Sequence, residues 1–219
     1  GLPAIFIGGI KMSNIVSCVV YGDFACFTQP ELNAERVSYD VPTPSACRGI
    51  LEAIHWKPQI EYKILKIGIL KQIKFLNITR NEISRYQSLK RSIISINQKE
   101  TRTTRTSRIL KDVAYIITAR IQIKDEEESQ IKHIEIFNRR VERGKCFARP
   151  YLGCREFSAE FRPLRESDHP LNINSDLGLM FYDFDYSTKI PNPMFFHAKI
   201  EDGVINCDKK LIRCFQTKE

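Results

Sequence analysis

The chain has 219 residues, and its 34 Lys and Arg against 26 Asp and Glu give a formal net charge of +8. Hydrophobic residues make up 42% of the sequence, which excludes global disorder because such a composition can build a packed core. No apolar run approaches the roughly 20 residues of a membrane span, and the basic excess favours a polyanionic partner, above all nucleic acid.

The N-terminal residues and the cysteines indicate where the protein works. Residues 1–11 are apolar without a basic leader, so we interpret them as added or upstream sequence before a start at Met12, not as a signal peptide. The seven cysteines form no CxxC spacing, which indicates neither a disulfide framework nor a zinc site. We therefore expect reduced thiols in a cytoplasmic protein that needs no metal or cofactor and contacts no membrane.

The first elements are a strand and a helix. Residues 14–21 are rich in β-branched and aromatic side chains and end at a Gly-Asp turn, which predicts a strand. A helix is expected from Ala46 to about His55, with Ser45 as its N-cap and Pro58 as its stop.

The end of that helix brings an imidazole, the only tryptophan and an ammonium together in His55-Trp56-Lys57. We interpret Trp56 as a core anchor, since a large aromatic side chain usually packs inside. For His55 two interpretations stay open: a functional imidazole, or an ordinary histidine that ends a helix.

The middle of the chain alternates apolar and basic residues. Residues 59–78 predict a long strand or a bent pair of strands with one cationic face. Residues 98–108 are polar and cationic without core positions, so we expect a mobile loop that is either simply solvated or clamps a nucleic-acid backbone. Strict alternation then predicts a strand over residues 109–124.

A second helix follows, and it carries a lysine–histidine pair. Its expected buried stripe has three- and four-residue spacing and consists of Ile131, Ile134, Phe137 and Val141. Lys132 and His133 are consecutive, hence about 100° apart on the helix surface, where they would flank the stripe. An imidazole beside an ammonium suits proton transfer to a phosphate, although two solvated helix residues are the plainer alternative.

The remaining pattern completes an α+β fold. Residues 154–162 alternate again, so the order is β-α-β-β-α-β, the ferredoxin-like (RRM-like) pattern of many RNA-binding modules. We predict this domain over residues 12–163. Residues 164–219 would form a small C-terminal β-rich appendage, with strands over 177–186 and 194–207 and a turn at Glu201-Asp202-Gly203.

Several blocks together resemble one known family. They are Tyr21-Gly-Asp-Phe-Ala25, Glu35-Arg-Val-Ser-Tyr39, Pro42-Thr-Pro-Ser-Ala46, Arg48-Gly-Ile-Leu-Glu-Ala-Ile-His-Trp-Lys-Pro58, Leu110-Lys-Asp-Val113, Lys132-His133, Phe137-Asn-Arg-Arg140, Gly144-Lys-Cys-Phe147 and Arg149-Pro-Tyr-Leu-Gly-Cys-Arg-Glu-Phe157. In this order they resemble the repeat-cleaving subunit of subtype I-C (Dvulg) CRISPR Cascade, in the RAMP superfamily. Residues 164–219 match more weakly.

The resemblance implies a metal-independent endoribonuclease that cuts CRISPR repeat RNA and stays bound to the product. Its partners would be that RNA, the other Cascade subunits and target DNA within the complex. Carried over by motif, its catalytic residues would be His55, Lys132 and His133. Some members have Tyr at the position of His55, and the glycine-rich loop usual in the superfamily is not evident here.

RNA supplies its own nucleophile, the 2′-hydroxyl, so cleavage needs a base, a cation for the oxyanion and an acid for the leaving oxygen. We assign these roles to His55, Lys132 and His133 respectively, and expect the three to face one another across a cationic groove. The products would be a 2′,3′-cyclic phosphate and a 5′-hydroxyl. The expected contacts to the RNA backbone are Arg36, Arg48, Lys57, Arg139, Arg140, Arg143, Lys145 and Arg149.

Two other functions stay open. A non-catalytic Cascade subunit that holds the 5′ handle of the guide RNA would need the same basic face. A generic RNA-recognition module would expose paired aromatic residues on central strands. Tyr115, Phe157 and Phe161 lie on expected strands, but their alternation places them in the core.

Overall fold

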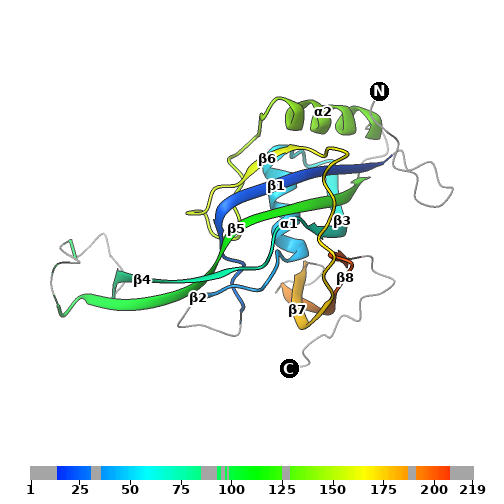
Figure 1. The fold of residues 1–219 in the computed structure, drawn as a ribbon. Helices are drawn as coiled ribbons and strands as arrows, with labels where there is room; N and C mark the ends of the chain where they lie inside the picture. Colours follow the sequence, from blue (N-terminus) through cyan, green and yellow to red (C-terminus); the bar gives the residue numbers. More distant parts are fainter. Residues whose placement is uncertain are drawn as a thin grey trace.

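The computed structural model describes residues 14–30, 36–84, 93–94, 97, 99–124, 129–186 and 191–207. Within these ranges the elements follow the order β1 (Ile15–Ala25), β2 (Arg36–Val37), α1 (Pro44–Ile54), β3 (Ile60–Ile69), β4 (Phe75–Ile83), β5 (Arg102–Ile123), α2 (Gln130–Glu142), β6 (Glu160–Pro163), β7 (Ser175–Asp185), β8 (Asn192–Glu201) and β9 (Val204–Asn206). The result is an α+β fold with a mostly antiparallel sheet and two helices (Figure 1). Residues 1–11 lie outside the described ranges.

The centre of the sheet has the strand order β6-β1-β5-β3. Alternation explains these strands, since Val16, Cys18 and Val20 of β1 point into the core beside the inward residues of β5. Helix α1 packs on β3, whereas α2 packs on β1, β5 and β6, and the two helices touch. Both helices therefore cover one face of the sheet, where the Tyr62 and Phe137 rings pack 5.9 Å apart.

The polar stretch expected as a loop is instead part of a strand, so that prediction is wrong over residues 102–108. β5 runs from Arg102 to Ile123, and its first half pairs with β4 in a hairpin that projects away from the core sheet (Figure 1). Cross-strand pairs hold this arm together in place of a core: Thr79 with Thr106 at 3.3 Å, and the Arg108 guanidinium 3.8 Å from the centre of the Phe75 ring. The bent pair of strands expected over residues 59–78 corresponds to β3 and β4.

Asp112 separates the two halves of β5. Its φ of 54° lies in the left-handed region, which is unusual for a residue other than glycine. The pairing of β1 with β5 skips this residue, because Gly22 pairs with Val113 and Phe24 with Lys111. It lies where the pairing of β5 passes from β3, which ends opposite Tyr115, to β4, which begins opposite Leu110, so the arm begins at this residue.

The first helix begins two residues before the predicted start. Its N-cap is Thr43, whose Oγ1 accepts a hydrogen bond from the Ala46 N–H at 3.1 Å, with Pro44 in the first turn. The prediction of Ser45 as the cap is therefore wrong, and the Ser45 hydroxyl instead donates to Asp183 of β7 at 3.1 Å. The strand predicted over residues 154–162 begins later than expected. It starts at Glu160 as β6, and Gly153, whose φ is positive, lies before it.

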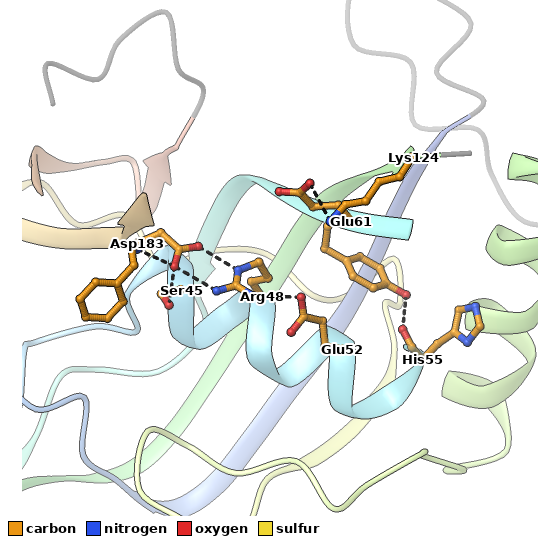
Figure 2. Close-up of polar contacts among 9 residues, drawn as sticks. Ser45, Arg48, Glu52, His55, Glu61, Lys124 and Asp183 are labelled. Atoms are coloured by element: carbon orange, nitrogen blue, oxygen red, sulfur yellow. Dashed lines mark hydrogen bonds and ion pairs between the residues drawn. The ribbon is translucent and has the colours of Figure 1, made fainter. Parts of the chain in front are cut away.

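Strands β7, β8 and β9 continue the same sheet, because β9 pairs with β3. The turn predicted at Glu201-Asp202-Gly203 lies between β8 and β9, with positive φ at Asp202 and Gly203. A partly buried ion pair adds a second link: Arg48 of α1 contacts Asp183 of β7 at 2.8 and 3.0 Å and Glu52 at 3.0 Å (Figure 2). The division at residue 163/164 stays a prediction.

The cysteines that the structure describes are all free thiols, four of them buried. In the same part of the chain, no helix is long and apolar enough to cross a bilayer.

Candidate active site

The C-terminal end of α1 positions His55. This residue is the C-cap: its N–H donates to the Leu51 carbonyl at 2.9 Å, and its extended backbone leads the chain out of the helix. The Tyr62 hydroxyl of β3 donates to the His55 carbonyl at 2.8 Å (Figure 2). Two elements thus fix the backbone of this histidine, and its side chain extends toward α2.

The buried face of α2 differs from the predicted stripe. His133, Phe137 and Val141 are its buried residues, at four-residue spacing, while Ile131 is 65% exposed. The prediction for Ile131 is therefore wrong, and His133 occupies the stripe instead of flanking it. Lys132, next to it, is exposed.

The two histidines meet directly. Nε2 of His55 lies 3.0 Å from Nδ1 of His133, with ring centroids 5.3 Å apart and the ring planes at 27°. Both side chains are buried, at 1% and 2% exposure. The expected groove between them is absent, because they are in hydrogen-bond contact.

Burial also determines the charge of His55. Loss of solvent, together with the positive charge of Arg140 and smaller effects of His133 and Lys57, lowers its pKa to about 4. The imidazole is therefore neutral near pH 7 and available as a base. Within the described part of the chain, its Nδ1 is buried without a hydrogen-bond partner, the kind of costly arrangement that is kept at functional sites.

The segment after α2 returns to the end of α1. The Phe147 and Ala148 N–H groups both donate to the Ala53 carbonyl at 2.9 Å, and Arg140 Nη1 donates to the Ile54 carbonyl at 2.6 Å. These bonds satisfy carbonyls that a helix end leaves without partners. The residues that hold the site together thus come from both helices and from the loop behind α2.

Trp56 does not anchor the core, so that prediction is wrong. Its side chain is 44% exposed, and its ring packs against Phe147, itself 64% exposed, at 6.1 Å between centroids. Phe147 is not among the site residues that the sequence predicts. The available signal was aromatic residues interleaved with basic ones, in His55-Trp56-Lys57-Pro58 and again in Arg143-Gly-Lys-Cys-Phe147.

The predicted RNA contacts divide into two groups. Arg36 pairs with Glu156 at 3.2 Å, Arg149 pairs with Glu160, and Arg48 and Arg140 make the contacts given above. In contrast, no ion pair within the described residues engages the remaining four, which are Lys57, Arg139, Arg143 and Lys145; all are exposed. Lys57 follows α1, Arg139 lies in the last turn of α2, and Arg143 and Lys145 follow α2, so all four are near the buried histidines in the chain.

Comparisons with known proteins extend the sequence resemblance. The chain is 41% identical to a CRISPR pre-crRNA endoribonuclease Cas5d of Mannheimia succiniciproducens over 215 residues, covering 89% of this chain and 95% of the relative. It is 38% identical to the protein of the same name from Thermus thermophilus over 203 residues, covering 84% and 87%. A crystal structure of a CRISPR-associated protein has 25% identity and a TM-score of 0.67, with 92% and 95% covered.

The family description that matches is CRISPR-associated protein (Cas_Cas5), and the match runs over residues 16–208. It includes the C-terminal strands, which contain none of the blocks quoted above. The chain belongs to the Cas5d branch of the Cas5 family of CRISPR-associated proteins.

Proposed function

We propose that this protein is a pre-crRNA endoribonuclease that cuts CRISPR repeat RNA without a metal ion and remains on the product as a Cascade subunit. The single observation that carries the proposal is the direct contact of His55 with His133, 3.0 Å apart and beside Lys132. Two relatives named as pre-crRNA endoribonucleases, at 41% and 38% identity, support the substrate.

The chemistry assigns one role to each side chain. Neutral His55 takes the proton of the 2′-hydroxyl, whose oxygen then attacks the neighbouring phosphorus. Lys132 stabilises the negative charge that develops on the phosphate oxygens. His133 gives a proton to the departing 5′-oxygen, leaving a 2′,3′-cyclic phosphate and a 5′-hydroxyl.

Substrate access requires a change in this site. Both imidazoles are buried, so RNA must uncover them before either can exchange a proton with it. The same burial would suit a purely structural pair in a non-catalytic subunit that holds the 5′ handle, which is the alternative function.

The strand order β6-β1-β5-β3, with both helices on one face, supports the ferredoxin-like interpretation of residues 12–163. Residues 164–219 would be its appendage. We retain Lys57, Arg139, Arg143 and Lys145 as the backbone contacts nearest the site in the chain. The remaining contacts predicted from the sequence, together with target DNA as a further partner and the cytoplasm as the location, stay predictions.

The test is cleavage of end-labelled repeat RNA in excess EDTA. We expect wild-type protein to cut it, to leave a 2′,3′-cyclic phosphate, and to leave uncut an RNA with a 2′-deoxy nucleotide at the cleavage position. An RNA with the deoxy nucleotide one position further along serves as the control and should be cut normally. Cleavage that stops with EDTA, or that continues on the deoxy substrate, would refute the mechanism; no cleavage of any RNA would favour the non-catalytic alternative.

A further inference from the structure

We propose that Trp56 and Phe147 form a stacking platform for an unpaired RNA base, next to the histidine pair. This inference rests on the proposed function, because it takes RNA as the ligand of the same region. It assigns a binding role to two side chains that the cleavage chemistry does not use.

The exposure of the two rings is the first observation. They are 44% and 64% exposed, although a ring pair of this size ordinarily sits in a core or an interface. Their centroids lie 6.1 Å apart with the planes at 33°, so the two rings pack against each other while each keeps an exposed aromatic surface. Each base of a single strand has a flat π-face that stacks on such a surface, whatever its sequence.

The rigidity of the platform is the second observation. Trp56 directly follows His55, whose N–H and carbonyl are both held by hydrogen bonds. The Phe147 N–H donates to carbonyls of α1, at 2.9 Å to Ala53 and 3.2 Å to Ile54. A base on these rings therefore lies at a fixed place relative to the end of α1, where His55 directly precedes Trp56 in the chain.

Charge selects the ligand. The segment from Arg139 to Arg149 contains five Lys and Arg and a single acid, Glu142, and Lys57 adds a sixth cation beside Trp56. A protein partner with an apolar surface would gain nothing from this excess, whereas a nucleic-acid strand offers a phosphate for every base. Aromatic faces bordered by basic side chains are the usual combination in sites for single-stranded RNA.

The chain offers a direct test, because Trp56 is its only tryptophan. We would titrate full-length protein with a single-stranded oligo(U) RNA and follow tryptophan emission, while fluorescence anisotropy of labelled RNA reports binding independently. Stacking predicts saturable quenching with the same Kd as the anisotropy. A blunt RNA duplex, whose bases are already stacked, should give much less quenching.

Variants separate stacking from charge. Trp56→Ala and Phe147→Ala should weaken oligo(U) binding roughly 5- to 150-fold, the range for one lost base–aromatic contact. Trp56→Phe should keep most of the affinity, which also guards against a variant that merely misfolds. Tyr186→Ala is the matched control, since this aromatic residue is 66% exposed directly after β7 and should not affect binding.

The outcomes also separate this proposal from the nuclease. If RNA binds while Trp56 emission and the affinity of Trp56→Ala stay unchanged, the platform is refuted, even where wild-type protein still cuts the repeat. If RNA quenches Trp56 but no repeat RNA is cut, the platform stands and the nuclease proposal fails.

Discussion

We expect acid to destabilise this protein through His55, and the loss of stability depends on how far folding lowers the pKa of this imidazole. Its pKa falls from 6.5 to about 4 on folding, so the unfolded chain binds more protons and stability rises with pH across that window. The free energy of unfolding is therefore highest above pH 6.5, where His55 is neutral in both states, and it decreases as the pH falls toward 4. Linkage between these two pKa values gives a loss of about 2 kcal/mol between pH 8 and pH 5.

Urea unfolding at pH 8 and pH 5 measures this loss, and His55→Gln removes the titrating group while keeping a side chain that can bond to His133. We expect wild-type protein to lose about 2 kcal/mol more than the variant between the two pH values. The exposed His169, replaced by Gln, is the control and should behave as wild type. Equal pH dependence of wild type and His55→Gln would show that the fold does not keep this imidazole neutral. That result would remove the physical argument for His55 as the general base.

Other perturbations test the supports of the site by urea unfolding. Asp183→Asn removes the charged partner of Arg48 in a partly buried pair and should cost about 2 kcal/mol. Glu61→Gln removes the partner of Lys124 in an exposed pair and should leave stability unchanged. Equal effects of the two substitutions would contradict a stabilising link between α1 and β7. Gly153→Ala should cost about 3 kcal/mol or more, because its φ is +84° and a Cβ would lie 2.0 Å from a backbone oxygen. Gly49→Ala on the open face of α1 should instead stabilise by about 1 kcal/mol, and a loss there would refute our account of that helix face.

The core of the fold could be predicted because its signals are local. β1 and the second half of β5 alternate apolar and polar residues, and Pro58 marks the region where α1 has ended. The arm could not be predicted in the same way, since residues 102–108 bury no apolar face and depend on cross-strand partners in β4. β-branched threonines were the signal available there.

The sequence predicts which residues form the candidate site but not how they are arranged. His55 and His133 were both named from sequence, yet their burial depends on the packing of α1 against α2, which no local pattern encodes. Helical spacing alone favoured Ile131 for the buried stripe, because an isoleucine is the more usual core residue. The same preference favours Trp56 as a core residue, whereas its side chain lies at the surface against Phe147.

Single-turnover cleavage of repeat RNA by wild type and His133→Ala, in EDTA, tests the central assignment most directly. Loss of the proposed acid should slow cleavage by roughly 10²- to 10⁴-fold, while circular dichroism and RNA affinity stay near the wild-type values. Equal rates for the two proteins would remove His133 from the chemistry and contradict the account.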